Sequence, residues 1–368
     1  MGVTPSGLRM LWLSIAAALV LSGCIAATQT PDPQTVVVDH PPATPHHFPA
    51  DSWEVIQNPE IMGWSSVKLE LVGQQFKNIG ATALMIVDNG VVVAQWGATE
   101  RRVNCHSVRK SFLSALYGIF IQQGALNPQE TLGSLGIDDI QGLSRDEKRA
   151  SVLDLLKARS GVYHPAAYET AGMKKKRPKR GSHLPGTHWY YNNWDFNALG
   201  TIFRQETSRD IFQAFDETIA LPIGMEDFKI SDCKYVKAFS SKHPAYPFRM
   251  SARDRARFGL LLLRNGKWNN QQIIPEHWVE ESTTSYSYAG PGIGYGYMWW
   301  VSTGQWHLGN RVQGKAFSAR GHWGQYIVIL PAYNLVIVQV SDKSGSGRNA
   351  SGRKFNTLLS LILAAREK

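Results

Sequence analysis

The sequence contains 3 cysteines among 368 residues, and the apolar run near its N-terminus is short. That run extends from Met10 to Leu21, whereas a helix that crosses a bilayer needs roughly 20 apolar residues. Hydrophobic residues make up 43% of the chain and aromatic residues 11%, enough for a large core that needs no disulfide bonds. The composition excludes a small disulfide-dependent scaffold, and the short run excludes a membrane-spanning helix at this position.

The N-terminal residues have the features of a signal peptide. One positive charge, Arg9, precedes the apolar run, and residues 21–24 read Leu-Ser-Gly-Cys. This ending resembles the lipobox of bacterial lipoproteins, in which the cysteine becomes acylated and N-terminal. We expect residues 1–24 to be a lipoprotein signal peptide and the lipid on Cys24 to attach the protein to a membrane; the alternative is cleavage without lipidation. Ile25 stands where an aspartate is associated with inner-membrane retention, so the expected location is the bacterial cell envelope, at the outer membrane and facing the periplasm.

Residues 25–50 are rich in proline and threonine and show no sustained helical or strand period. This composition predicts a mostly extended tether between the membrane and the folded domain. His46 and His47 are adjacent in this segment, but no further metal-ligating residue follows at a useful spacing, so we expect no metal site here.

Cys105 and Cys233 are the cysteines that remain after Cys24. An oxidising envelope would permit a disulfide between them. The alternative is that each is a small buried thiol.

The chain is basic, with 39 Lys and Arg against 29 Asp and Glu, a net charge of +10. Loss of the signal peptide removes Arg9 and leaves 38 minus 29, or +9. Such a balance favours anionic surfaces or substrates. Much of it lies in residues 174–180, Lys-Lys-Lys-Arg-Pro-Lys-Arg, which carry no aromatic interleaving or nucleic-acid motif. We therefore expect no nucleic-acid partner, and a solvated loop is the alternative to a binding site.

Strand patterns occur near both ends of the chain. Residues 83–87 and 91–96 flank Asp-Asn-Gly, and Asn-Gly favours a tight hairpin. Further strand patterns occur at 294–301, 325–330 and 335–340. Helical patterns occur at 65–79, 112–121, 151–156, 254–263 and 354–366. The order predicts an α+β fold over 51–368, with an antiparallel sheet built from N- and C-terminal strands (51–130 and 285–368), flanked by helices, and a mainly helical inserted subdomain (131–284).

Ser-x-x-Lys occurs four times, so the spacing alone identifies no site. The copy at Ser107 and Lys110 differs because the helix that follows is apolar nearly all round and should be buried. One helical turn aligns the two side chains, and burial lowers the pKa of a lysine, so a neutral amine could accept the serine proton. The alternative is an N-cap serine beside a surface lysine.

Two later segments carry polar groups suited to the same chemistry. Residues 185–193, Pro-Gly-Thr-His-Trp-Tyr-Tyr-Asn-Asn, offer Tyr-x-Asn in two registers, and a phenol can relay protons while an amide holds a lysine or a carbonyl. Residues 316–325 are glycine-rich and lead into a strand, whose edge can offer an N–H to an oxyanion. The alternatives are a polar helix entry and a glycine-rich hairpin turn.

These motifs occur in a characteristic order: Ser-Val-Arg-Lys-Ser-Phe, a helix running into Arg-Ser-Gly-Val, Pro-Gly-x-x-Trp-x-Tyr-x-Asn and Gly-x-x-Gly-Gln. The order resembles that of the serine β-lactamase-related hydrolases, which include class C β-lactamases, DD-peptidases, esterases and nylon-oligomer (aminohexanoate) hydrolases. The resemblance covers residues 80–345 and implies the β-lactamase/DD-peptidase-like fold.

The resemblance also implies roles for individual residues. Ser107 would be the acylated nucleophile, Lys110 its base partner and Tyr191 the proton-relay phenol, with Asn193 beside it. Whether the lysine or the tyrosinate is the base is left open by the family. The oxyanion hole would join the amide of Ser107 to that of His322.

The third motif departs from the family pattern. β-Lactamases and DD-peptidases carry Lys-Thr-Gly or Lys-Ser-Gly there, and its lysine and hydroxyl grip the substrate carboxylate. This chain reads Ala319-Arg320-Gly321, or His322-Trp323-Gly324 in the other alignment, and lacks the hydroxyl in both. Arg320 could replace the lysine, with Gly321 beside it in the substrate-binding set. The departure favours an amidase or esterase over a β-lactamase.

We therefore expect an exported, lipid-anchored serine hydrolase that cleaves an amide or ester bond in a small molecule or peptide, without a metal or organic cofactor. The basic run at 174–180 is expected to steer anionic substrates among these. The alternatives are a cell-wall DD-carboxypeptidase or weak β-lactamase, and a non-enzymatic lipoprotein that binds an anionic glycan or peptide at a relic site. The substrate itself is not predicted, because variable loops build the acyl pocket in this superfamily.

Overall fold

The computed structural model describes residues 36–41, 46–342 and 352–367. The expected signal peptide, Cys24 and the first part of the expected tether lie outside these residues. Within the described part of the chain, no helix is both long and apolar enough to cross a membrane.

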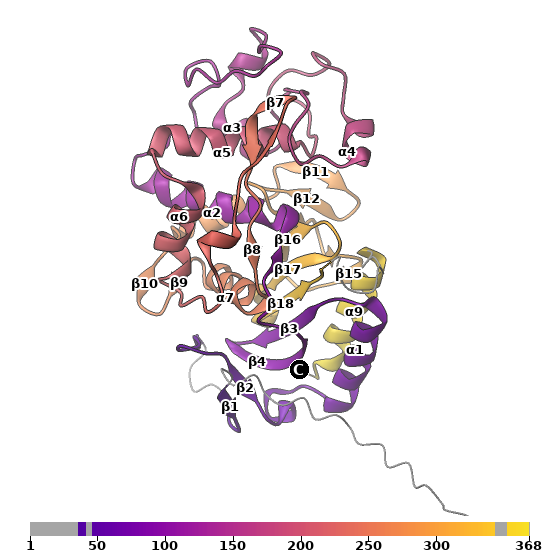
Figure 1. Cartoon of the computed structure of the whole chain (residues 1–368). Helices are drawn as coiled ribbons and strands as arrows, with labels where there is room; N and C mark the ends of the chain where they lie inside the picture. The colour runs from indigo at the N-terminus through magenta and orange to yellow at the C-terminus, as the bar shows by residue number, and fades with distance from the viewer. Residues whose placement is uncertain (1–35, 42–45, 343–351, 368) are drawn as a thin grey trace, which may run out of the picture. The chain divides into compact units, whose positions relative to one another are not determined.

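A sheet of 10 strands organises the fold, in the order β1-β2-β4-β3-β18-β17-β16-β13-β12-β11 (Figure 1). Its strands are β1 (Val36–Val38), β2 (Glu54–Ile56), β3 (Ala83–Asp88), β4 (Val91–Gly97), β11 (Ser287–Gly290), β12 (Ile293–Tyr295), β13 (Trp300–Ser302), β16 (Phe317–Gly321), β17 (Gln325–Leu330) and β18 (Leu335–Val340). The two ends of the chain meet where β3 pairs antiparallel with β18. The predicted assembly of one sheet from N- and C-terminal strands is confirmed.

Helices cover both faces of this sheet. The α-helices of the described residues are α1 (Ser66–Ile79), α2 (Arg109–Gln122), α3 (Val152–Leu156), α4 (Ala171–Lys176), α5 (Asn193–Thr207), α6 (Ile211–Phe215), α7 (Ala252–Leu263), α8 (Glu276–Ser282) and α9 (Gly352–Ala365). On β3, Ile86 packs with α1 and α9, whereas Val87 faces the core that includes α2 and α7. Figure 1 shows α1 and α9 side by side on their face. Successive side chains of a strand point to opposite faces of the sheet, so each face has its own apolar core against the helices that cover it.

Short two-stranded ribbons accompany the helices. They are β5 (Val103–Asn104) with β8 (Arg249–Met250), β6 (Val236–Ala238) with β7 (Ser241–Ala245), β9 (Lys267–Trp268) with β10 (Gln271–Gln272), and β14 (Trp306–His307) with β15 (Asn310–Arg311). The β5–β8 ribbon leads directly into the turn before α2 and so holds the start of that helix.

The hairpin between β3 and β4 follows the sequence prediction. Asn89 and Gly90 have φ angles of 49° and 82°, the left-handed values that a tight hairpin turn requires. A side chain at Gly90 would also collide with the carbonyl oxygen of His47, 2.2 Å from its Cβ position. Gly90 is therefore needed both for the hairpin turn and for the close approach of the segment that contains His47.

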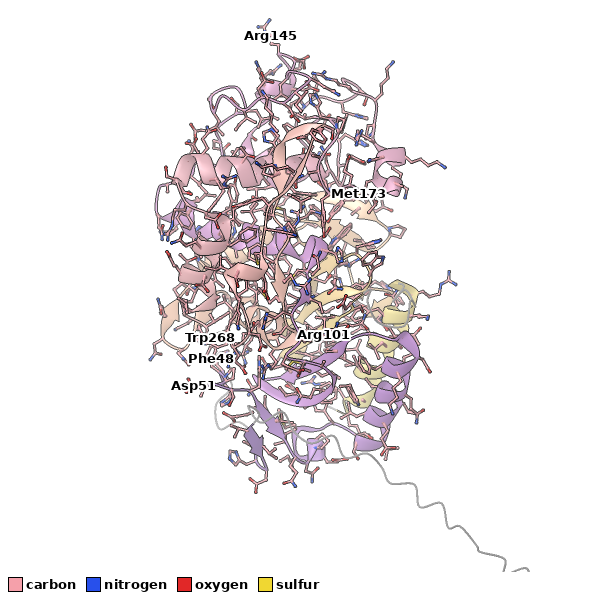
Figure 2. The ribbon with its side chains drawn as sticks, in the orientation of Figure 1. Phe48, Asp51, Arg101, Arg145, Met173 and Trp268 are labelled. Carbon is pink, nitrogen blue, oxygen red and sulfur yellow. The ribbon has the colours of Figure 1, made fainter. Side chains whose placement is uncertain are left out.

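Part of the expected tether belongs to the folded domain. β1 pairs parallel with β2, and β2 pairs parallel with β4, so this edge of the sheet is not antiparallel as predicted. Phe48 packs on Trp268 with ring centroids 5.0 Å apart (Figure 2), and His47 bonds Glu54 at 3.1 Å. The extended conformation was predicted, but the pairing was not, because residues 36–38 are too few to show a period.

The predicted strand at 294–301 is wrong as a single element. The structure divides it into β12 and β13 around a turn in which Met298 has a φ of 63°. Ser111 Oγ of α2 donates to the carbonyl of Met298 at 2.9 Å, and Ser114 Oγ donates to that of Tyr297 at 2.7 Å. The turn is favoured because its backbone groups pair with the buried helix rather than with a neighbouring strand.

Candidate active site

Ser107 and Lys110 lie at the start of α2. Ser107 is in the 3-10 turn His106–Val108, and Lys110 is in the first turn of the helix that follows. Lys110 Nζ lies 2.8 Å from Ser107 Oγ and 2.7 Å from Tyr191 Oη. The three side chains that the sequence assigned to catalysis therefore form one hydrogen-bonded group.

Tyr191 is held by the start of α5 and by aromatic packing. It precedes Asn192, whose side chain caps the helix, and its ring stacks on Trp300 with centroids 5.3 Å apart. The neighbouring Tyr190 points elsewhere, with its hydroxyl donating to the carbonyl of Met173 at 2.8 Å. Of the two Tyr-x-Asn registers in the sequence, the structure brings Tyr191 to Lys110.

Burial changes the acid–base properties of this group. Lys110 is 1% exposed, and desolvation, helped by the positive charge of Arg109, holds its pKa well below the ordinary lysine value. Desolvation raises the pKa of Tyr191 to about 12, although a hydrogen bond with Ser107 and the charge of Arg109 act in the opposite direction. This environment favours the neutral amine of Lys110 and the protonated phenol of Tyr191.

Arg109 was not identified from the sequence as part of the site. Its side chain is fully buried, its Nη2 donates to Asn197 Oδ1 at 3.1 Å, and its guanidinium lies 4.3 Å from the ring centroid of Tyr246. Within the described residues it has no carboxylate partner, and its Nε and Nη1 have no hydrogen-bond partner. Among the described residues, a positive charge without a carboxylate partner therefore lies next to Lys110 in the chain.

The third motif reaches the site at the end of β16. A Cβ on Gly321 would lie 2.6 Å from the carbonyl oxygen of Cys105, so the glycine permits the strand to approach the turn that carries Ser107. His322 and Trp323 form the turn to β17, since Gly321 pairs with Gln325 across the hairpin. The ring of His322 lies 6.0 Å from that of His106, the residue before the serine.

Asn193 is the first residue of α5, and its side chain contacts the loop that contains Tyr168. Its Nδ2 donates to the carbonyl of Tyr168 at 2.8 Å, and its Oδ1 is buried without a partner in the described structure. The side-chain amide of Asn193 thus holds the loop that contains Tyr168, and its Oδ1 can still accept a hydrogen bond from a substrate.

Arg320 packs over the ring of Trp300. Its Nε donates to Ser318 Oγ at 2.9 Å, and its guanidinium lies 5.1 Å from the ring centroid of Trp300, which also stacks on Tyr191. Its Nη2 is buried without a hydrogen-bond partner among the described residues. Burial lowers the pKa of Arg320 to about 10.

The two candidate disulfide cysteines are free thiols in the structure. Cys105 is buried, Cys233 is partly exposed, and burial raises the pKa of the Cys233 thiol to about 12. No group of three or more His, Cys, Asp or Glu side chains in the described ranges is arranged to hold a metal ion.

The basic run divides into two kinds of residue. Arg177 pairs with the buried Glu169, and Arg180 pairs with the buried Glu147, so these two arginines have structural partners. The lysines of the run are exposed, three of them on α4 and one beyond it: Lys174, Lys175, Lys176 and Lys179. The hydrogen bond from Tyr190 to Met173 ties α4 to the segment that carries Tyr191.

Comparisons with known proteins agree with this arrangement. A family model described as Beta-lactamase matches residues 70–361. An uncharacterized protein of Alkalihalophilus pseudofirmus is 22% identical over 325 residues, covering 77% of this chain and 92% of that protein. A D-aminopeptidase of Brucella anthropi is 27% identical over 187 residues, covering 42% of this chain and only 33% of that enzyme.

Solved structures show the same fold. A Bacillus anthracis protein assigned as a 6-aminohexanoate-dimer hydrolase superposes with a TM-score of 0.61 at 23% identity, covering 79% of this chain and 80% of its own. A D-alanine carboxypeptidase of Burkholderia cenocepacia superposes with a TM-score of 0.60 at 18% identity, covering 81% and 99%. The chain belongs to the beta-lactamase family, and this membership supports a serine hydrolase.

Proposed function

We propose that this protein is an exported serine hydrolase that cleaves amide or ester bonds through an acyl-enzyme on Ser107. The observation that carries the proposal is the contact of Lys110 Nζ with both Ser107 Oγ and Tyr191 Oη, at 2.8 and 2.7 Å. A serine within hydrogen-bond reach of a buried amine is the arrangement that activates a hydroxyl as a nucleophile.

In the proposed acylation step, Ser107 Oγ attacks the substrate carbonyl and its proton passes to the neutral amine of Lys110. The carbonyl oxygen becomes an oxyanion that accepts hydrogen bonds from the amides of Ser107 and His322. Collapse of this intermediate breaks the amide or ester bond, and the leaving group takes a proton relayed by Tyr191 from Lys110. Water then attacks the acyl-enzyme in the reverse sequence of proton transfers.

The environment of the phenol supports Lys110 as the base. A pKa of about 12 leaves very little tyrosinate at neutral pH, whereas burial and Arg109 favour the neutral amine of Lys110. Tyr191 is accordingly assigned the relay.

Linear amides and esters are the proposed substrate class. The residues in place of Lys-Thr-Gly are Ala319, Arg320 and Gly321, which lack the hydroxyl, and the Arg320 guanidinium packs over the ring of Trp300. The D-aminopeptidase and the D-alanine carboxypeptidase in the comparisons are named for cleavage of peptide-like amides. A cell-wall carboxypeptidase is the second candidate, and acylation of Ser107 by a fluorescent penicillin would favour it.

The decisive experiment is intact mass spectrometry after reaction with a fluorophosphonate probe. We expect one label on the wild type and none on Ser107→Ala, with Lys110→Ala labelled at least 100-fold more slowly because the base is lost. Ser231→Ala is the matched control, because Ser231 is an exposed serine in another Ser-x-x-Lys of this chain. Unaltered labelling of Ser107→Ala would show that another serine reacts and would reject the mechanism.

Export and attachment are proposed on the sequence of residues 21–24. Cys24→Ser should abolish incorporation of a labelled fatty acid and move the protein from the membrane to the soluble envelope fraction. Fatty-acid labelling that persists in Cys24→Ser would reject the anchor.

A further inference from the structure

Three residues beside Ser107 have a backbone conformation that non-glycine residues rarely adopt. His106, Tyr168 and Trp323 have φ angles of 49°, 66° and 60°. Such a left-handed conformation is unfavourable for a bulky side chain. They come from three separate segments: the turn before α2, the loop before α4 and the hairpin turn after β16.

The rings of these residues meet. The His106 ring lies 6.2 Å from Tyr168, nearly parallel to it, and 5.0 Å from Trp323, edge to face. His322 completes the group, 6.0 Å from His106 and 4.8 Å from Trp323. We name these four residues the aromatic rim. His322 is exposed and the other three are partly exposed, so ring surface remains accessible next to the serine.

Hydrogen bonds hold the rim in place. Asn104 Nδ2 donates to the Tyr168 hydroxyl at 2.6 Å, and Asn104 Oδ1 accepts from the amide of His106 at 2.8 Å. Asn193 holds the carbonyl of Tyr168 at 2.8 Å. The hydroxyl and the backbone of Tyr168 are thus engaged within the protein, and the faces of the rings are what the rim offers to a ligand.

From this arrangement we infer that the aromatic rim is a specificity subsite that binds an uncharged aromatic or other apolar group of the substrate beside the scissile bond. The inference deepens the proposed hydrolase and rests on it. A substrate carbonyl placed between Ser107 Oγ and the amide of His322 brings its substituents next to rings that flank both residues. Aromatic groups gain from stacked and edge-to-face contacts in such a setting.

The surrounding charges disfavour a cationic occupant. The guanidinium of Arg109 lies 5.9 Å from the ring centroid of Tyr168, so a positive group would be repelled there. Burial, together with the charges of His322, Arg255 and Arg109, lowers the pKa of His106 to about 4, so its ring is neutral at neutral pH. A substrate group without charge avoids both repulsion and the loss of hydration of an ion.

The test compares two ethyl phosphonofluoridates, one with a benzyl and one with a methyl group on phosphorus. In each reaction the serine oxygen forms a P–O bond, the P–F bond breaks, fluoride leaves and the hydroxyl proton passes to the base. The second-order rate constant for labelling of Ser107 is followed by intact mass on the full chain in detergent. The ratio of the two constants, compared between variants, cancels the intrinsic reactivity of the probes.

We expect Tyr168→Ala and Trp323→Ala each to lower the benzyl-to-methyl ratio about tenfold, because a stacking surface is lost. The methyl probe should react within about threefold of the wild-type rate, and Tyr168→Phe should keep the ratio because it keeps the ring. Trp306→Ala is the matched control, since Trp306 is a tryptophan on β14 that is 54% exposed.

The outcomes separate the two proposals. If the wild type is labelled and the benzyl-to-methyl ratio is unchanged in both alanine variants, the subsite proposal is rejected and the proposed hydrolase is not. Equal losses with both probes assign these residues a structural role and also overturn the rim. A folded wild type that neither probe labels overturns the proposed function, and the rim with it.

Discussion

At the scale of single residues, Arg109 and Lys110 are neighbouring basic side chains in one buried turn, and only Lys110 contacts the serine. Burial of two cations is unfavourable unless one of them loses its proton, and an arginine retains its proton far more readily than a lysine. The buried arginine therefore acts as a fixed charge that favours the neutral form of the lysine, which is the form that accepts a proton.

This electrostatic role predicts the pH dependence of Arg109→Met. Removal of the positive charge raises the pKa of Lys110 toward its ordinary value, so a larger fraction of the amine is protonated and inactive at a given acidic pH. The acid limb of kcat/KM should move to higher pH, and activity at a fixed pH on that limb should fall about tenfold for every pH unit that the limb moves. A pH profile of ester hydrolysis measures it. Arg145→Met, which changes an exposed arginine far from α2 (Figure 2), should leave the profile in place.

The proposed relay predicts the effect of removing one hydroxyl. Tyr191→Phe keeps the ring that stacks on Trp300 but loses the oxygen 2.7 Å from Lys110 Nζ. We expect kcat to fall about 100-fold, which is a typical contribution of positioned acid–base catalysis. Tyr190→Phe is the matched control because its hydroxyl bonds to Met173 instead. Equal activity of the two variants would remove Tyr191 from the mechanism.

Sequence reasoning recognises some residues of this site and misses others for a physical reason. Ser107, Lys110 and Tyr191 belong to short motifs whose spacing and order are visible along the chain. Arg109 and Tyr168 acquire their importance from contacts with distant segments, namely Asn197, Tyr246 and His106. Local patterns contain no trace of such contacts.

At the scale of elements, the approach of β16 to the turn before α2 depends on one glycine. A Cβ at position 321 would lie 2.6 Å from the carbonyl oxygen of Cys105 and 2.8 Å from Cβ of Gln325. Neither neighbour is the flexible end of a long side chain, so the strand or the turn has to move.

Gly321→Ala should therefore impair both stability and chemistry. We expect a loss of about 1–3 kcal/mol in the free energy of unfolding, the range for overpacking, and slower labelling of Ser107 because the His322 amide is displaced. Thermal denaturation and fluorophosphonate labelling measure the two effects. Gly172→Ala on α4 is the matched control, because its nearest non-neighbouring atom is 3.9 Å from the added Cβ. Wild-type labelling by Gly321→Ala would show that the close approach is not needed.

The elements that were predicted correctly are those with strong local signals. The Asn-Gly hairpin has a specific turn sequence, the helices α1, α7 and α9 have apolar residues at helical spacing, and β17 and β18 are apolar runs separated by a turn that contains Pro331. The strand at 294–301 failed because its continuous apolar pattern conceals a turn held by serines of α2. The structure shows capping boxes at Ser144 and Glu147, where a 3-10 turn follows, and at the start of α3.

At the scale of the whole molecule, we assign the proposed electrostatic steering of anionic substrates to the four lysines of the basic run at 174–180 and not to its two arginines. Arg177 and Arg180 neutralise buried glutamates, so their loss would leave unpaired charges and destabilise the fold. The exposed lysines at 174, 175, 176 and 179 are the charges that can act on a diffusing substrate.

Replacing these four lysines with glutamine should lower kcat/KM for an anionic ester several-fold at low ionic strength. The effect should shrink at 0.15 M salt, where the screening length is about 8 Å, and a neutral ester of the same acyl group should react at the wild-type rate. Steady-state kinetics at two salt concentrations measure both. The same loss for the neutral ester would mean that the lysines act on the structure and not on diffusion.

The parallel pairing of β1 with β2 has a consequence for where this chain can work. The pairing fixes Val36 to the sheet, so a lipid on Cys24 would be joined to the folded domain by residues 25–35 alone. Such a segment spans at most about 40 Å when fully extended. A lipid on Cys24 would then keep the β1 edge of the folded domain within that distance of the membrane surface, and loss of the lipid would release the domain without altering the residues around Ser107.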